Sequence, residues 1–388
     1  MKNSTNINSK NKKLLYVLTS SISYILIEDL IEELAKEFKV YLITSFNPDL
    51  KSKCKKNNIT YFSSPLKRYP SLLWDLICFF HSFWILIKIK PDIVNYSTPK
   101  ASFIYSLSTF LFGIKNRIYL VRGIRHETLK NPAKQIQINV EKISCNLSTK
   151  VIALSRSVKT TFIKEGICKN KKIEVIGPGG SGIFNHRFSK PTVKEKKISR
   201  KIFKVQKGFF VIGYCGRLVP RKGIEDLVEA FQNLQYKHKN ICLLLAGSYD
   251  KKSILKASAL KSINENSLIK YVGYIKQKDL RSFYHCLDLY VSASPSEGFG
   301  NTQVEAAMSG LPVVAKNVTG SKDAVKNNFN GTLFNPKSLK YLQKAIEKYL
   351  SYKEIYREHS KNSTIWAKKF HRSIVTAAWK AFYLDLIS

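Results

Sequence analysis

The feature that most constrains the fold of this chain is an alternation of short apolar runs with helical patterns, which occurs twice. In the first half, a helical pattern covers residues 25–38, and runs rich in β-branched and large apolar residues occupy 14–19, 40–44, 93–96, 117–121 and 151–154. In the second half, helical patterns at 224–234, 278–285 and 303–309 separate runs at 209–214, 241–246, 269–272, 287–293 and 312–314. Strands that alternate with helices favour a parallel, doubly wound α/β sheet. Two Rossmann-like domains with a ligand cleft between the carboxyl edges of their sheets are therefore expected.

The chain length fits this organisation, because 388 residues are too many for one average domain and enough for two. Residues 191–207 are dense in lysine with little apolar periodicity and are interpreted as an interdomain linker. The expected organisation is a polar tail (1–13), an acceptor-binding domain (14–190), the linker (191–207), a donor-binding domain (208–364) and a C-terminal packing helix (365–388).

The charge balance limits the classes of partner. The 65 Lys and Arg against 27 Asp and Glu give a net charge of +38, which attracts nucleic acid, anionic lipid or phosphorylated small molecules. Part of this excess is compositional, since Asn, Ile, Ser and Tyr are abundant together with Lys. A nucleic-acid-binding protein would need a basic stripe interleaved with aromatic residues or a recognisable module, and the sequence contains neither. No nucleic-acid partner is expected.

Cysteine usage and the N-terminus indicate a reducing, cytoplasmic location. The seven cysteines form no CxxC pair, so they predict neither a disulfide framework nor a zinc site. No cluster of metal ligands is visible, and no metal is expected. The first residues are polar and lysine-rich, where a signal peptide would be apolar.

One apolar segment, residues 72–89, leaves two interpretations open. It is nearly long enough to span a membrane, but it carries Asp75 and His81. The segment is either a helix buried in the first domain or a membrane-contacting helix. Its flanking basic residues, which are Lys67, Arg68, Lys88 and Lys90, support the second interpretation.

The most informative motif is SASPSEGFGNTQVEAAMSGLPVV, residues 292–314. A strand ends in a loop with Glu297, Gly298 and Gly300, and a helix is expected to begin near Thr302. Glycines let backbone N–H groups approach a ligand, and the start of a helix offers a phosphate unpaired donors and partial positive charge. Glu297 would lie at the sugar end of such a ligand, and Glu305 would face ribose hydroxyls.

These residues resemble glycosyltransferase family 4, the retaining GT-B enzymes, whose hallmark is two glutamates eight positions apart within PSxxEGFGxxxxEAMAxGxPVV. The family's second landmark, GRLxxxKG, is matched by residues 216–223. The resemblance implies that Arg217 and Lys222 hold the donor diphosphate. A departing nucleoside diphosphate accumulates negative charge, so fixed cations there stabilise the transition state. The other donor contacts implied are Gly216, Gly298, Phe299, Gly300, Asn301, Thr302 and Tyr274.

Residues 97–101 (STPKA) and 117–128 (RIYLVRGIRHET) resemble the branch of this family that builds bacterial surface polysaccharides on polyprenyl-diphosphate carriers. This similarity implies that Lys100, Arg122 and Arg125 contact the acceptor. Two departures stand out. The usual glycine pair after the first strand is replaced by residues 19–23 (TSSIS), so Ser21 is expected to contact the donor instead, and a common His position holds Arg122. Nearby His126 is either a packed bystander or an active-site group.

The resemblance implies a retaining transfer of a hexose or N-acetylhexosamine from a nucleoside diphosphate sugar, expected to be UDP-linked, to a glycan or polyprenyl-diphosphate-linked acceptor. It also implies no cofactor besides this donor, and a place on the inner face of the cytoplasmic membrane. The pathways implied are those of capsule and lipopolysaccharide O-antigen. An alternative is a GT-B-shaped epimerase or phosphorylase, because a fold alone does not decide the chemistry.

Overall fold

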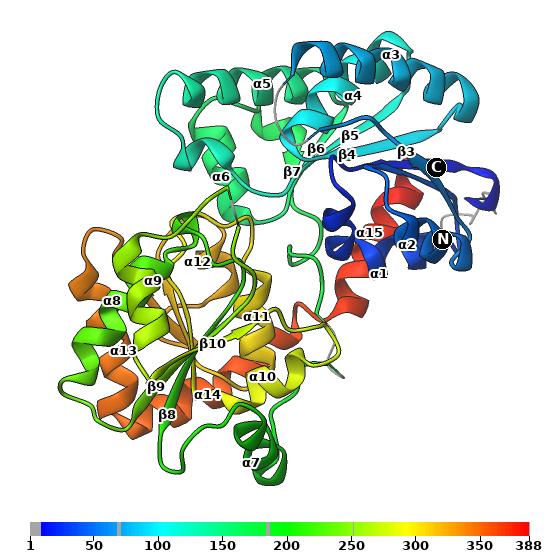
Figure 1. Cartoon of the computed structure of the whole chain (residues 1–388). Coiled ribbons are helices and arrows are strands. Elements are labelled where there is room, and N and C mark those ends of the chain that lie inside the picture. Colours follow the sequence, from blue (N-terminus) through cyan, green and yellow to red (C-terminus); the bar gives the residue numbers. More distant parts are fainter. Residues whose placement is uncertain (1–8, 68–70, 184–186, 251, 388) are drawn as a thin grey trace. The chain divides into compact units, whose positions relative to one another are not determined.

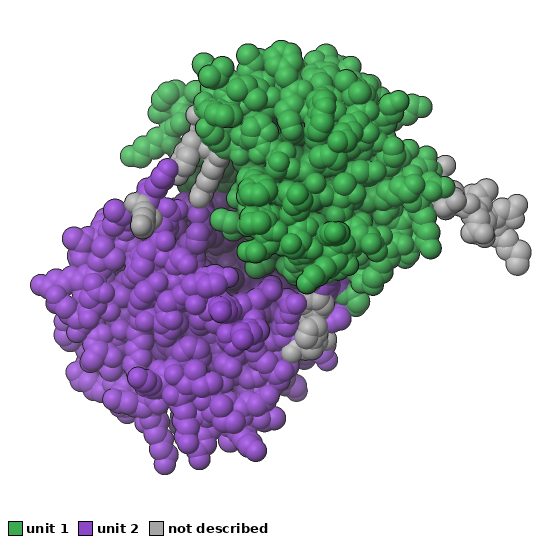
Figure 2. Space-filling view, turned by 45° about the vertical axis from the view of Figure 1, so that its right-hand side comes forward, with its two compact units in different colours: residues 1–181, 373–388 green, residues 182–372 purple. Residues whose placement is uncertain are grey.

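The computed structural model describes residues 9–67, 71–183, 187–250 and 252–387. The chain forms two compact units, one of residues 1–181 with 373–388 and the other of residues 182–372 (Figure 2). We call them unit 1 and unit 2. Each is an α/β unit built on one parallel sheet, as the alternating pattern predicts.

Unit 1 contains a seven-stranded parallel sheet in the order β3-β2-β1-β4-β5-β6-β7. Its strands are β1 (Lys13–Val17), β2 (Lys39–Thr44), β3 (Ile59–Ser63), β4 (Ile93–Ser97), β5 (Asn116–Val121), β6 (Lys150–Ala153) and β7 (Ile173–Glu174). The strand order reverses between β1 and β4. In doubly wound sheets this reversal is the switch point, and ligands bind outside the carboxyl ends of the strands beside it.

Helices cover both faces of this sheet (Figure 1). One face carries α3 (Leu72–Ile89), α4 (Pro99–Leu111) and α5 (Ala133–Leu147); the other carries α1 (Glu28–Leu34), α2 (Pro48–Lys56) and α15 (Arg372–Asp385). The remaining helical segments of unit 1 are α6 (Arg156–Lys164) and the 3-10 turns η1 (Ser9–Asn11), η2 (Ser21–Leu26), η3 (Arg125–Thr128) and η4 (Asn170–Lys172).

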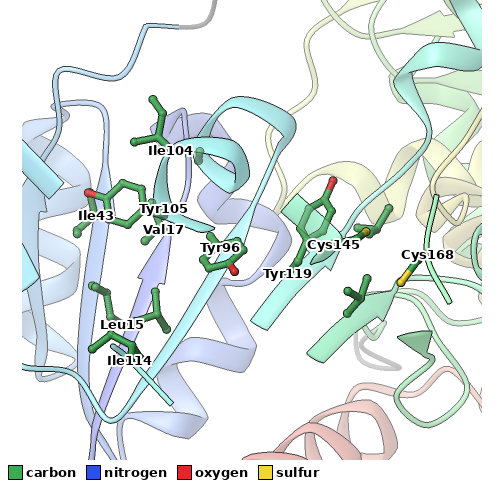
Figure 3. Packing of buried hydrophobic residues seen from close by; sticks show 14 of the residues in the cluster. Leu15, Val17, Ile43, Tyr96, Ile104, Tyr105, Ile114, Tyr119, Cys145 and Cys168 are labelled. Carbon is green, nitrogen blue, oxygen red and sulfur yellow. The ribbon is translucent and has the colours of Figure 1, made fainter. Parts of the chain in front are cut away.

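The core beneath α3, α4 and α5 is formed by alternate residues of the central strands. Leu15 and Val17 of β1, Tyr96 of β4 and Tyr119 of β5 are buried there (Figure 3). Because side chains alternate along a strand, the intervening residues face α15 on the opposite side. There the hydroxyl of Tyr383 lies 2.5 Å from that of Tyr16, which fastens the last helix of the chain to the first strand.

Unit 2 repeats the same plan with six parallel strands in the order β10-β9-β8-β11-β12-β13. The strands are β8 (Phe210–Cys215), β9 (Ile241–Ala246), β10 (Ile269–Gly273), β11 (Leu289–Ser292), β12 (Val313–Lys316) and β13 (Gly331–Phe334). The helical segments are α7 (Val193–Ile202), η5 (Pro220–Lys222), α8 (Ile224–Gln235), α9 (Ala257–Glu265), α10 (Leu280–Cys286), α11 (Asn301–Met308), α12 (Ser321–Ala324), α13 (Leu339–Ser351) and α14 (Lys353–Lys368). Its switch point lies between β8 and β11.

Two segments differ from the sequence-based expectation. The expected linker contains α7, which begins with a capping box in which Thr192 and Glu195 cap each other's backbone N–H groups. Lys196 and Arg200 hold α7 on unit 2 through Asp288, at 2.7 and 2.5 Å. The expected C-terminal packing segment, residues 365–388, is divided, because α14 ends at Lys368 within unit 2 and α15 packs in unit 1.

Segment 72–89 is one continuous helix with two different faces. Cys78, Ile85 and Leu86 are buried in the core, whereas Leu72, Phe80 and Ile87 are 94%, 63% and 60% exposed. Among the described residues, α3 is the one helix that is long and apolar enough to cross a membrane, which by itself is weak evidence for doing so. The interpretation of a fully buried core helix is therefore wrong for its outer face. Arg68, one of the flanking basic residues, lies outside the described residues.

Candidate functional site

The carboxyl edge of the unit 2 sheet, at the switch point between β8 and β11, gathers the residues of both sequence motifs. Gly216 follows β8, and its N–H donates to the carbonyl of Ala246 at 2.9 Å. Gly247, after β9, has φ +139°, and a Cβ on it would lie 1.7 Å from the carbonyl oxygen of Gly216. The backbone segments after β8 and β9 are therefore packed too closely for a side chain at Gly247. The side chains available at this edge are those of Arg217 and of the loop after β11.

Lys222 reaches the loop after β11 because of a tight glycine contact. Gly223 has φ +68°, and a Cβ on it would lie 2.2 Å from the carbonyl oxygen of Ala293. This close approach brings the end of η5 against the end of β11, where the Lys222 ammonium donates to Glu297 at 2.5 Å. Both side chains are about four-fifths buried. The structure thus joins the two sequence motifs in a single partly buried ion pair.

Arg217 has different surroundings. Its guanidinium lies 3.8 Å from the carboxylate of Asp250, and its side chain is 42% exposed. Exposed ion pairs at such distances contribute little to stability, so this cation remains free to change partner. Asp250 follows β9 and was not expected as a site residue, although the run that it ends, residues 243–250 (LLLAGSYD), resembles the family.

The loop that ends at Gly300 leads into α11, which begins at Asn301, close to the expected start near Thr302. Gly300 has φ +93° and precedes α11, and a Cβ on it would lie 2.8 Å from the side chain of Gln303. Asn301 Oδ1 is buried and accepts no hydrogen bond from the described residues. Phe299 differs from the expectation of a donor contact, because its ring is buried and packs against Phe370 with centroids 5.0 Å apart. Its side chain anchors the loop to the core of unit 2.

Two residues that the motif reading missed hold this loop in place. The amide of Gln303 is fully buried and donates to Ser321 at 2.9 Å. Gly320 has φ +81°, and a Cβ on it would lie 2.3 Å from the carbonyl oxygen of Glu297. Gln303 lies within the family motif and Gly320 lies outside it, so only Gln303 could have been proposed as a site residue from the sequence.

Glu305 lies one helical turn into α11 and is partly buried. Its carboxylate accepts a hydrogen bond from the hydroxyl of Tyr284 at 2.7 Å. Burial raises the pKa of Glu305, and the hydrogen bond from Tyr284 and the charge of Arg187 oppose this effect. Tyr274, the last expected donor contact, follows β10 at the same edge and is 69% exposed.

In unit 1, the segment after β1 that was expected to contact the donor through Ser21 is held by hydrogen bonds with hydroxyl side chains. The backbone N–H of Ser21 donates to Ser45 at 3.0 Å, and the hydroxyls of Thr19 and Thr98 lie 2.6 Å apart. Thr19 follows β1 and Thr98 follows β4, so these groups occupy the switch point of this sheet.

The three expected acceptor residues have different environments. The Lys100 ammonium pairs with Asp75 of α3 at 2.5 Å and also donates to the carbonyl of Lys67. Arg125 is exposed at the start of η3. Arg122 follows β5 and is partly buried, and its Nε donates to the hydroxyl of Ser97 at 3.2 Å.

His126 is fully buried and lies between two carboxylates, Glu141 at 3.3 Å and Glu165 at 2.6 Å. Burial alone would lower the pKa of His126, but the hydrogen bonds and charges of Glu141 and Glu165 outweigh it, and the pKa is raised. This environment is that of a packed ion pair, and it supports the bystander interpretation. Among the described residues, no group of three or more His, Cys, Asp or Glu side chains is arranged to hold a metal ion.

Comparison with known protein families gives two matches that together span most of the chain. Residues 25–179 match Glycosyltransferase Family 4, and residues 195–366 match Glycosyl transferases group 1. Solved structures agree on the fold. A sucrose-phosphate synthase from Thermosynechococcus elongatus superposes with a TM-score of 0.79 at 18% identity, covering 97% of this chain and 99% of that one. HepE of Anabaena, solved with UDP and glucose, gives 0.75 at 18% identity, with coverage of 97% and 100%.

Two relatives in sequence are more specific. The chain is 34% identical over 344 residues to the capsular polysaccharide biosynthesis glycosyltransferase CapM of Staphylococcus aureus, covering 88% of both. It is 24% identical over 301 residues to a UDP-Gal:alpha-D-GlcNAc-diphosphoundecaprenol alpha-1,3-galactosyltransferase of Escherichia coli, covering 77% of this chain and 76% of that one. With two Rossmann-like sheets and both motifs at one strand edge, the chain therefore belongs to the family 4 glycosyltransferases of the GT-B fold, in the branch of surface-polysaccharide synthesis.

Proposed function

We propose that the protein transfers a hexose or N-acetylhexosamine from a UDP-sugar, with retention of configuration, to a polyprenyl-diphosphate-linked saccharide. The product would serve bacterial surface polysaccharide synthesis, as capsule or O-antigen. The observation that carries the proposal is that the Lys222–Glu297 ion pair and the exposed Arg217 both lie at the carboxyl edge of the unit 2 sheet. The names of two comparison proteins support the substrate classes, since one uses UDP-galactose and a diphosphoundecaprenol acceptor and the other binds UDP and glucose.

The proposed chemistry assigns separate tasks to the named groups. A donor diphosphate at the edge of β8 would draw the Lys222 ammonium partly away from Glu297 and would also pair with Arg217. As the glycosidic bond breaks, negative charge grows on the leaving phosphate, and fixed cations stabilise that charge more than the ground state. The departing phosphate would help to deprotonate the acceptor hydroxyl on the same face, so the proposal needs neither a protein nucleophile nor a cofactor.

The donor proposal is tested by measuring nucleotide release across a panel of UDP- and GDP-sugars, with a short-chain polyprenyl-diphosphate-linked saccharide as acceptor. We expect turnover with one UDP-sugar and an α-linked product from an α-linked donor, identified by NMR. An inverted anomeric centre would refute the retaining mechanism. An epimerised free sugar nucleotide or a phosphorolysis product would replace the transfer proposal with the alternative chemistry.

We also propose that the protein works at the cytoplasmic face of the membrane, with α3 lying on the lipid surface. The outer face of α3 presents large apolar side chains, and exposed apolar surface of this kind marks an interaction site. The charge of its two polar residues is reduced, because Asp75 pairs with Lys100 and burial lowers the pKa of His81, which favours the neutral imidazole. The ammonium of Lys67 lies 3.6 Å from the ring centre of Trp74, a pairing suited to the headgroup region.

A further inference from the structure

The carboxyl edge of the unit 1 sheet has a cation at its switch point that belongs to neither of the unit 2 motifs. Thr19 follows β1, Ser97 ends β4 and Arg122 follows β5, and these three strands are neighbours in the sheet. Ser97 accepts the hydrogen bond from Arg122, and Thr98 next to it pairs with Thr19. The switch point is where doubly wound sheets bind their ligands.

Arg122 has no acidic partner there. Within the part of the chain that the structure describes, no ion pair includes Arg122, and its terminal nitrogens donate no hydrogen bond. The groups that interact electrostatically with its guanidinium are the hydroxyls of Tyr16 and Tyr383. Burial raises the pKa of both phenols far above neutrality, so they carry no compensating charge.

The guanidinium nevertheless stays charged. Burial lowers the pKa of Arg122 to about 10, which still leaves it protonated at neutral pH. Arginine presents a rigid fork of donors that matches the oxygens of a phosphoryl group. A partly buried arginine that uses only Nε therefore keeps its fork for a ligand.

We propose that Arg122 binds a phosphoryl group of the acceptor's diphosphate, with the hydroxyls of Thr19 and Thr98 as neighbouring donors. The inference rests on the proposed function, which supplies a diphosphate-linked acceptor. The donor's own diphosphate already has Arg217 and Lys222 in unit 2, so the unit 1 cation is available to the second anionic substrate. The residue thus selects acceptors by their phosphate rather than by their sugar.

The first experiment separates the two substrates by kinetics. Arg122→Gln should raise the KM for a polyprenyl-diphosphate-linked acceptor about tenfold or more, the scale of a lost charge-assisted hydrogen bond, and leave the donor KM unchanged. Arg122→Lys should give an acceptor KM between those of the wild type and Arg122→Gln. Inorganic pyrophosphate should compete with the acceptor in the wild type and much less in Arg122→Gln. A rise in donor KM alone, or no change in either KM, would overturn the proposal.

The second experiment does not depend on transfer activity. In a Lys222→Ala background, which weakens the unit 2 anion site, pyrophosphate should raise the melting temperature, and adding Arg122→Gln should remove that shift. Without pyrophosphate, Arg122→Gln should melt no lower than its parent, because it removes a partly buried charge that forms no ion pair with the described residues. A pyrophosphate shift that survives Arg122→Gln refutes the site. Absent transfer to any lipid-linked acceptor in the wild type would instead refute the proposed function.

Discussion

Lys222 and Arg217 follow the same strand, yet their surroundings prepare them for different tasks. Lys222 is held by Glu297 in a partly buried pair, whereas Arg217 has only a long, exposed contact with Asp250. A phosphate must displace Glu297 to gain the first cation but can gain the second almost freely. Removing either one should impair catalysis far more than folding.

We expect Arg217→Ala and Lys222→Ala each to lower kcat/KM by about 100- to 1000-fold, the scale of losing one positioned charge partner in a water-poor site. Steady-state kinetics on the preferred donor measure this. Lys256→Ala is a matched control, because Lys256 is an exposed lysine of the same unit and its side chain is 77% exposed. An active double variant with near-normal UDP affinity would show that the diphosphate binds elsewhere.

The two glutamates should leave different kinetic signatures. Glu297→Gln should mainly lower kcat, because its partner Lys222 would lose the carboxylate next to the reacting bond. Glu305→Ala should mainly weaken UDP binding, by roughly 1–3 kcal/mol for lost charge-assisted hydrogen bonds. Tyr284→Phe, which removes the hydrogen bond to Glu305 and keeps the ring, should weaken it less. Calorimetric UDP affinities alongside kcat distinguish the roles, and wild-type kcat in Glu297→Gln would contradict the first.

The buried pair of His126 predicts a pH dependence of stability. Its pKa is raised above the ordinary value, so its contribution is complete below about pH 6.5 and is lost as the pH rises through the folded-state pKa. Breaking a buried pair costs about 3–5 kcal/mol. We therefore expect the difference in unfolding free energy between wild type and His126→Gln to be largest near pH 6 and to shrink above it. A difference that grows with pH would contradict the paired imidazolium.

At the residue scale, the sequence motifs predicted which residues belong to one site but not which side chains contact each other. The two motifs assigned Lys222 and Glu297 to the same donor site without predicting their ion pair, and Phe299 was taken for a ligand contact although it packs on Phe370. A motif cannot distinguish a side chain that points to a ligand from one that points to the core. Burial depends on residues far away in the chain, such as Phe370.

At the scale of elements, α3 has the clearest functional consequence, because it uses one face for the core and leaves the other apolar. Ile85 and Leu86 are fully buried, and Phe80 and Ile87 lie on the outside. The sequence left a choice between core and membrane because its residues are apolar nearly all round, so no periodicity marked the faces. The neighbouring helix α4 decides which side is covered.

Flotation with anionic liposomes at low ionic strength should recover the wild-type protein, and salt should weaken the binding by screening Lys67 and Lys88. Phe80→Ser and Ile87→Ser together should reduce recovery. Ile254→Ser is the matched control, since Ile254 is 68% exposed in unit 2. No recovery of the wild type would refute the membrane proposal, and a dimer that these substitutions dissociate would assign the face to a second copy.

Other elements were predicted unevenly for physical reasons. The buried central strands β1, β4, β8 and β11 were predicted because parallel strands read as apolar runs. The edge strand β3 was missed, since only one of its residues is fully buried. Helix α7 was interpreted as a linker because its contacts with the protein are largely ionic, although its capping box could be read from the sequence.

At the scale of the whole molecule, the chain returns to its first unit at the end. The Tyr383 hydroxyl accepts a hydrogen bond from Asn95 at 2.6 Å and lies against Tyr16, while Lys380 pairs with Glu37. The contacts with Asn95 and Tyr16 tie the final helix to the central strands β4 and β1, and the pair with Glu37 ties it to the segment between α1 and β2. Sequence periodicity predicted a packing helix there but carried no information about which unit it would cover.

Tyr383→Phe should lower the unfolding free energy by about 1–3 kcal/mol, because it leaves two buried polar partners without their hydrogen bond. Denaturant unfolding of both proteins measures the change. Tyr341→Phe is the matched control, with a side chain 47% exposed in unit 2. Equal stability of Tyr383→Phe and wild type would contradict a stabilising role for this network.

The return of α15 also has a consequence for synthesis on the ribosome. Unit 2 is continuous, so all of its strands and helices have been made before residue 373 is added. Unit 1 begins first but receives α15 only after the whole of unit 2 has been made. A nascent chain therefore carries a finished unit 2 while one face of the unit 1 sheet still lacks α15, and that apolar surface is what a chaperone would meet.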